Sequence, residues 1–154
     1  MKSVDEYGEY AKSLFMKGYN CSQSVVCAFS DVLDIDEKML MRLSSPFGGG
    51  MGRLREVCGA VSGMFIVLGL LEGYDDVSDI NLKTELYKKV QKLAADFEAE
   101  NGTIICRELL GLDKGKDSPV PEERTKEYYE KRPCPDKVKS AAKILAKYLN
   151  EQNY

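Results

Sequence analysis

The chain has 154 residues with 25 acidic and 22 basic side chains, a formal charge of −3, five cysteines, no histidine and no tryptophan. This length suits a single domain, residues 1–154, and the negative charge gives no basic surface for DNA, RNA or anionic lipid. Without histidine the chain cannot form a Ser-His-Asp or Cys-His catalytic site or ligate haem through histidine, so cysteine is the residue best able to do chemistry near neutral pH.

The first half of the chain predicts helices and one glycine-rich loop. Apolar residues recur there at helical spacing, next to residues that commonly cap or end helices. The segment 44–52 contains proline and four glycines, which break regular structure, so we predict a loop. The predicted helices cover about 4–17, a stretch from Asn20 or Cys21 with its apolar stripe to Val32, a stretch from Asp34 or Asp36 through Leu43, and a central apolar helix over about 56–71.

The second half predicts further helices around one surface loop. No stretch alternates apolar and polar residues over a convincing length, so no strand is expected. The predicted elements are a long helix from Ser78 to about Asn101, a short helix from Thr103 through Leu110, a loop over 112–121, a helix from Pro121 through Tyr129, and a last helix from Asp136 through Tyr148. The sequence therefore predicts an all-α, compact single-domain bundle of about six to eight helices with a central apolar helix.

The N-terminal segment indicates the compartment. Residues 1–7 have no apolar stretch of the kind that a secretory signal needs, so we expect a cytoplasmic protein. The most apolar run, 57–71, is shorter than the roughly 20 residues that cross a bilayer, so no membrane insertion is expected. In a reducing cytosol cysteines are seldom permanent disulfides, and several of them together favour redox or metal chemistry.

Four of the five cysteines fall at or near predicted helix N-termini: Cys21, Cys58, Cys106 and Cys134. A helix N-terminus carries partial positive charge and unpaired N–H groups, which favour thiolate over thiol. Arginines lie near three of them, with Arg53 and Arg55 before Cys58, Arg107 after Cys106 and Arg132 before Cys134. We therefore expect a set of activated, partly ionised cysteines. Cys27 lies in mid-helix, where filling the core is the better interpretation.

The segment from Cys58 to Gly63 is the sharpest local signal. Gly59 and Gly63 share one helical face with Ala60 adjacent, so another backbone can approach closely beside Cys58. Because glycine inside a helix costs about 0.5–1 kcal/mol, this close approach is expected to be used. With the preceding arginines, Cys58 is the predicted attacking thiol.

The series Cys21, Cys58-Gly59-Ala60-x-x-Gly63, Cys106 and Cys134 resembles the redox-active protein family labelled C_GCAxxG_C_C. The resemblance extends from Gly18 to Cys134. It implies that the four signature cysteines are the catalytic residues, that Gly59, Ala60 and Gly63 belong to the same site as cofactor-binding residues, and that the protein carries out redox chemistry in a prokaryotic cytoplasm. It defines no reaction, and Cys27 lies outside the signature.

Three functions stay open at this point. The first is thiol–disulfide exchange with an unknown redox partner, which needs no cofactor and would differ from thioredoxin because CxxC is missing. The second is an all-cysteine zinc or iron–sulfur site, to which the glycine loop 48–52 could offer N–H groups if it is more than a plain turn. The third is an inert helical interaction domain. For each of the three functions, a homo-oligomer stays open.

Overall fold

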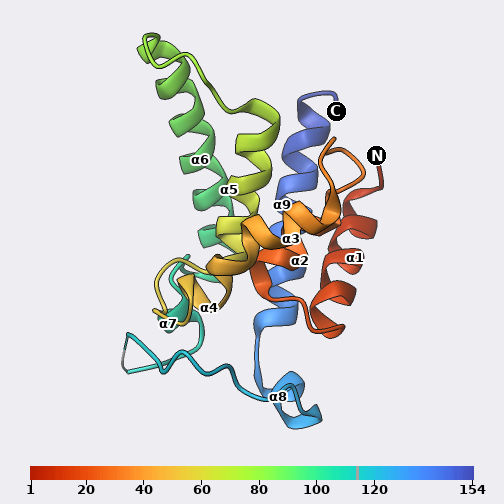
Figure 1. The fold of residues 1–154 in the computed structure, drawn as a ribbon, viewed down its shortest axis with the longest axis vertical. Helices are drawn as coiled ribbons and strands as arrows, with labels where there is room; N and C mark the ends of the chain where they lie inside the picture. Colours follow the sequence, from red (N-terminus) through yellow and green to blue (C-terminus); the bar gives the residue numbers. More distant parts are fainter. Residues whose placement is uncertain (114) are drawn as a thin grey trace.

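The computed structural model describes residues 1–113 and 115–154, and within them it confirms the all-α fold (Figure 1). The single β-type pairing in these residues is an isolated bridge between Val57 and Ile105. The helices are α1 (Val4–Met16), α2 (Cys21–Ala28), α3 (Glu37–Ser44), α4 (Gly48–Met51), α5 (Gly59–Glu72), α6 (Ile80–Asn101), α7 (Cys106–Leu109), α8 (Lys126–Lys131) and α9 (Cys134–Glu151). A 3₁₀ turn, Ser45–Phe47, joins α3 to α4.

The predicted loop over 44–52 is irregular, as expected, although its residues form turns. Gly49 and Gly50 inside α4 have φ of 68° and 67°, a left-handed conformation that an α-helix cannot contain. Apart from this distorted turn, eight helices have regular backbone in the described part of the chain, within the expected six to eight.

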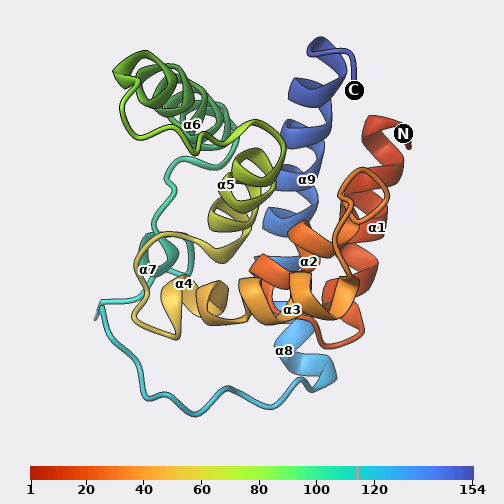
Figure 2. The same ribbon diagram turned by 45° about the horizontal axis from the view of Figure 1, so that its top comes forward.

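The core lies where α1, α2, α5 and α9 pack together (Figure 2). Tyr7 of α1 stacks on Phe29 with ring centroids 4.3 Å apart, and both are fully buried. The central apolar helix is confirmed for the first part of α5, whose residues through Leu68 are buried except for the partly buried Phe65 and Ile66. No helix in residues 1–113 and 115–154 combines the length and the apolar character needed to span a bilayer.

Local capping explains the helix starts that the sequence located well. Ser3 and Glu6 form a capping box at the start of α1, and Asn20 and Gln23 form another at the start of α2. Asp36 caps α3 by accepting a hydrogen bond from the Met39 N–H. These starts depend on residues within one turn, which a sequence shows directly.

The predicted start of the central helix near residue 56 is wrong by three residues, and tertiary pairing is the reason. The Cys58 N–H donates to the Ile104 carbonyl at 2.8 Å, and the Cys106 N–H donates to the Glu56 carbonyl at 2.6 Å. These bonds hold the chain before Gly59 extended beside the segment before α7, so α5 begins only after Cys58.

Four later helix starts are also shifted from the prediction. Asp79 caps α6 instead of Ser78, because its carboxylate accepts the Asn81 N–H at 2.9 Å. Thr125, not Pro121, caps α8. The N-cap of α7 is Ile105 instead of Thr103, and the N-cap of α9 is Pro133, so that Asp136 lies inside α9. The side chains of Ile105 and Pro133 make no capping hydrogen bond. The predicted loop 112–121 has no helix in its described residues, and position 114 lies outside them.

The small residues of α5 bring its backbone against α2, which confirms the predicted close approach. A Cβ atom added at Gly59 would lie 2.7 Å from the Phe47 carbonyl oxygen and 3.1 Å from the Cys21 Cβ. One added at Gly63 would lie 2.9 Å from the Val25 Cβ. No side chain fits in this contact, so glycine is required where the two helices meet.

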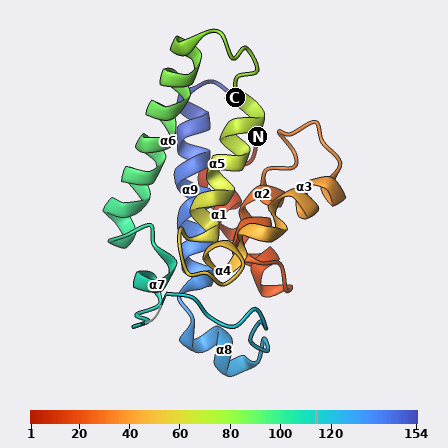
Figure 3. The ribbon, with the colours of Figure 1, turned by 60° about the vertical axis from the view of Figure 1, so that its left-hand side comes forward.

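The first residues of α2, α5, α7 and α9 face the same end of the molecule as the glycine turn of α4, while α6 extends toward the other end (Figure 3). Several N-termini and their N–H groups therefore lie near one another, although they come from segments far apart in the sequence.

Candidate functional site

The four signature cysteines line one cavity of about 570 Å³ at this end of the molecule. Its volume lies within the range of about 300–1,000 Å³ that is typical of small-molecule sites. The walls also include the glycine turn, the start of α9 and residues of the chain segment before α8. The fold thus brings the predicted cysteines together on one space.

Each signature cysteine stands at a helix N-terminus, as the sequence predicted. Cys21, Cys106 and Cys134 are the first residues of α2, α7 and α9, and Cys58 is the N-cap of α5. Cys27 instead lies in the last turn of α2, fully buried and away from the cavity lining. All five cysteines are free thiols, and no disulfide forms in the structure.

Cys21 has the environment that favours a thiolate. Its pKa is lowered to about 7, chiefly because the Cys134 thiol donates a hydrogen bond to its sulfur. Burial opposes this shift, whereas the Gly49 N–H and the positive charge of Arg124 add to it. Among the signature cysteines, Cys21 is therefore the one whose thiolate is most favoured.

The pKa of each of the other three signature thiols is raised, so the expectation of activated, partly ionised cysteines is wrong for them. Burial raises the pKa of Cys58 to about 12, and the negative charge of Cys21 adds to the rise. The pKa of Cys134 is raised well above its ordinary value because its S–H is held by Cys21. Burial also raises the pKa of Cys106, although the nearby guanidinium of Arg55 works against it.

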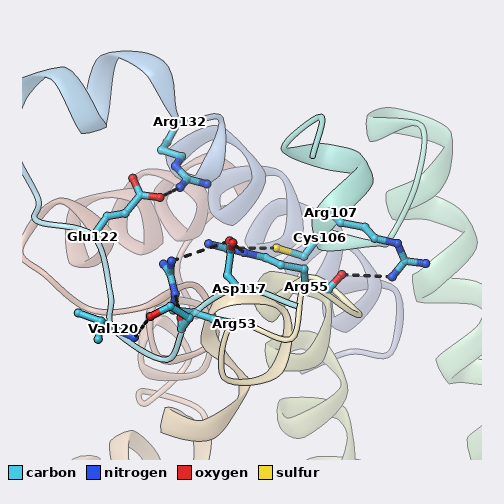
Figure 4. A network of polar contacts seen from close by, with 9 residues as sticks. Arg53, Arg55, Cys106, Arg107, Asp117, Val120, Glu122 and Arg132 are labelled. Carbon is cyan, nitrogen blue, oxygen red and sulfur yellow. Dashed lines mark hydrogen bonds and ion pairs between the residues drawn. The ribbon is translucent and has the colours of Figure 1, made fainter. Parts of the chain in front are cut away.

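The arginines that were expected to activate Cys58 point elsewhere (Figure 4). Arg55, which is 4% exposed, donates from Nε to the Asp117 carboxylate at 2.8 Å and lies with Nη1 3.6 Å from the Cys106 sulfur. Arg53 donates from Nε to the Ser118 carbonyl at 2.6 Å. Both arginines thus hold the segment that leads from α7 toward α8, and Arg55 serves Cys106 instead of Cys58.

The glycine turn supplies backbone donors and room. Gly50 has φ of 67°, and a Cβ atom there would lie 2.5 Å from the Cys106 Cβ and 2.9 Å from the Arg55 Cα. Only glycine allows the turn to pass this close to Cys106. The predicted ability of this loop to offer N–H groups to an anion is realised at Gly49, whose N–H supports the Cys21 thiolate.

The cations on the α8–α9 side of the cavity were not predicted from the sequence. Arg124 donates from Nη1 to the Phe15 carbonyl at 2.9 Å and from Nη2 to the Tyr19 carbonyl at 3.1 Å. Its guanidinium also lies 4.1 Å from the centroid of the Phe15 ring. The signal was a run of cations around Cys134 in the sequence, which includes Arg132 and Lys137, but only Arg132 was noted.

The motif residues of α5 divide between the cavity and the core. Gly59 and Ala60 line the cavity, whereas Gly63 lies on the face of α5 that contacts α2. Nothing in the structure tests a cofactor-binding role for these three residues, which stays a prediction.

The geometry does not fit a metal centre built on the cysteines. In the described part of the chain, no three Cys, Asp or Glu side chains converge in an arrangement that could hold a metal ion. A zinc site needs at least three converging protein ligands, and iron–sulfur clusters are commonly held by four. We therefore derive no chemistry through zinc or a cluster.

Comparison with known proteins gives one match. The family described as "Putative redox-active protein (C_GCAxxG_C_C)" matches residues 19–148, which include all four signature cysteines. No curated protein and no solved structure is significantly similar to the chain.

Proposed function

The chain belongs to the C_GCAxxG_C_C family of redox-active proteins, and we propose that it carries out thiol–disulfide exchange with Cys21 as the attacking thiolate and Cys134 as the resolving thiol. The observation that carries the proposal is the meeting of these two thiols in one cavity, where each is the main cause of the pKa shift of the other, downward for Cys21 and upward for Cys134. An ionised thiol beside a protonated one is the pairing that exchange requires.

The first step forms a mixed disulfide. The Cys21 thiolate attacks one sulfur of a disulfide RS–SR, the bond between Cys21 and that sulfur forms, the substrate S–S bond breaks, and RS⁻ leaves. The negative charge of Cys21 then no longer exists. Because the interaction with Cys21 is the main cause that raises the pKa of Cys134, forming the mixed disulfide makes Cys134 easier to deprotonate.

The second step releases the substrate. Cys134 loses its proton to RS⁻ or water and attacks the Cys21 sulfur, so that a Cys21–Cys134 disulfide forms and the second RS⁻ leaves. The two protein thiols have then lost two electrons, and the substrate disulfide has gained them. Turnover needs a dithiol or comparable reductant to restore both thiols, and we propose the reducing cytoplasm as the place where it is supplied.

This assignment moves the attacking role from Cys58 to Cys21. Cys58 is 6% exposed and its pKa is about 12, so almost none of it is ionised at neutral pH. Cys58 and Cys106 remain protonated members of the cavity wall.

A trapping experiment tests the assignment. The Cys134→Ser protein, treated with 2-hydroxyethyl disulfide, should keep one adduct, and peptide mass spectrometry should locate it on Cys21, because the resolving thiol is gone. The wild-type protein should lose two free thiols and keep no adduct. Cys27→Ala is the matched control and should behave as wild type. An adduct on Cys58, or none in the trapped variant, would overturn the proposal.

A further inference from the structure

The charge of the cavity is opposite in sign to that of the whole chain. The chain carries 25 acidic and 22 basic residues, but the described lining of the cavity contains five cations and one carboxylate. The cations are Arg53, Arg55, Arg124, Arg132 and Lys137, and the carboxylate is Glu122. A surplus of cations inside an acidic protein indicates a site for an anion.

Carboxylates in contact with the lining balance only part of this charge. Asp117 is shared by Arg53 and Arg55, with its Oδ2 3.8 Å and 2.8 Å from their nearest nitrogens, and Glu122 pairs with Arg132. Five cations against these two carboxylates leave three positive charges. The Cys21 thiolate lowers the surplus to two.

Arg124 and Lys137 carry the unbalanced charge. Within the described residues, the hydrogen-bond partners of Arg124 are two backbone carbonyls and the Tyr129 hydroxyl, and the partner of Lys137 is the Asn101 side-chain oxygen at 3.0 Å. Neutral acceptors fix the position of a cation without cancelling its charge, so both cations remain available to an anionic ligand.

The burial of the cavity thiols favours a small molecule over a folded protein. Cys58 and Cys106 are 6% and 8% exposed and Cys21 is only partly exposed, so a small disulfide reaches them more easily than a disulfide on a rigid protein surface. Apolar residues of the lining, among them Phe15, Leu109 and Val138, can cover the uncharged part of a ligand.

We propose that the oxidised substrate of this site is a low-molecular-weight disulfide that carries two acidic groups, bound with its sulfur at Cys21 and its acidic groups at Arg124 and Lys137. The inference rests on the proposed function, because the step is the exchange described above: Cys21 bonds to one substrate sulfur, the S–S bond breaks, and an anionic thiolate leaves.

Three disulfides of similar length but different net charge test whether the charge of the substrate sets its rate of reaction. The probes are 3,3′-dithiodipropionate with charge −2, 2-hydroxyethyl disulfide with no charge, and cystamine with charge +2. Each rate with wild-type protein is divided by the rate of the same disulfide with 2-mercaptoethanol, which has no charged group besides its attacking thiolate, so that differences in leaving group are removed. At low salt the dianion should react at least about tenfold faster than the neutral probe on this scale, with cystamine slowest, and added salt should shrink the difference.

Variants test whether Arg124 and Lys137 cause the preference for the dianionic disulfide. Lys137→Gln and Arg124→Gln should each reduce the ratio of dianion to neutral rates several-fold, whereas Lys147→Gln, an exposed position on the same helix as Lys137, should leave it unchanged. Lys137→Gln is the cleaner variant, because Arg124 also acts on the pKa of Cys21. Equal scaled rates for the three probes would overturn this inference and leave the proposed function standing, whereas failure of Cys21 to react with any probe would overturn the proposed function itself.

Discussion

The two ends of α2 place cysteines in opposite environments. Cys21 begins the helix at the cavity, and its pKa is lowered to about 7 by the Cys134 thiol, the Gly49 N–H and Arg124. Cys27 lies six residues later in the last turn, fully buried, and burial raises its pKa to about 11, with the negative charge of Glu37 adding to the shift. The same side chain on one short helix is thus favoured as a thiolate at one end and as a protonated, buried thiol at the other.

The comparison shows that burial alone does not decide how a thiol behaves. Cys21 is also substantially enclosed, and burial opposes its ionisation. The difference comes from hydrogen-bond donors. Cys21 receives hydrogen bonds from a thiol and a backbone N–H, whereas both causes of the Cys27 shift, burial and the charge of Glu37, disfavour the thiolate. Placement at a helix N-terminus helps, but Cys58 has it too and stays protonated.

Replacing each of these two cysteines should give the largest contrast. Cys21→Ser should slow the reaction of the protein with 2-hydroxyethyl disulfide at pH 7 by at least about 100-fold, because the attacking thiolate is missing. Cys27→Ala should leave the rate within about twofold of wild type, because a thiol with a pKa near 11 is ionised to only roughly one part in 10,000 at pH 7. The rates are measured by the release of 2-mercaptoethanol. Equal losses of rate in the two variants would contradict the distinction between the two ends of α2.

The contact of α5 with the first turns of α2 should be sensitive to one methyl group. Gly63→Ala should lower the free energy of unfolding by about 1–3 kcal/mol, because its Cβ would lie 2.9 Å from the Val25 Cβ. Gly69→Ala on the same helix meets no atom within 4 Å and should raise that free energy by about 0.5–1 kcal/mol. Urea denaturation of both variants measures the difference, and a gain from Gly63→Ala would contradict the close packing.

The pH dependence of stability should have opposite signs for the two cysteines. The folded pKa of Cys21 is below its ordinary value near 9, so its contribution is present above pH 9 and is lost as the pH falls to about 7. The folded pKa of Cys27 is raised, so its contribution is present below pH 9 and is lost as the pH rises to about 11.

Denaturation curves at several pH values test these signs. Relative to wild type, Cys21→Ser should lack the rise in stability between pH 7 and 9, and Cys27→Ala should lack the loss between pH 9 and 11. Parallel curves for wild type and both variants would show that neither thiol changes its pKa on folding.

Arg124→Gln should give the smallest effect, because Arg124 acts on Cys21 through its charge and behind stronger causes. The variant should raise the pKa of Cys21 and slow its alkylation at pH 7 about two- to fivefold. The rate should approach that of wild type at pH 9, where Cys21 is largely ionised in both proteins. A loss that persists at high pH would mean that Arg124 shapes the cavity instead of the charge of the thiol.

Much of this site was predictable because it depends on short-range signals. Asn20 and Gln23 fix the start of α2 through a local capping box, and Cys21 follows from it. The spacing of Gly59 and Gly63 predicted a close helix contact, although it did not identify α2 as the partner. All-α architecture followed from helical periodicity without any knowledge of packing.

The parts that could not be predicted depend on residues brought together by the fold. Arg55 precedes Cys58 in the chain but contacts Cys106, because the chain there runs beside the segment before α7. Cys21 was no better a candidate than Cys58 until Cys134, more than 100 residues away, was found beside it. Arg124 reaches the cavity through carbonyls of α1 and its following turn, which no local pattern indicates.

The rate of alkylation at each cysteine as a function of pH tests the central claim most directly. Iodoacetamide labelling of the reduced wild-type protein, resolved by peptide mass spectrometry, should show Cys21 reacting first with a midpoint near pH 7, while Cys27 and Cys58 stay unlabelled until well above pH 9. A midpoint for Cys21 near 9, or faster labelling of Cys58 at neutral pH, would contradict the assignment of Cys21 as the nucleophile.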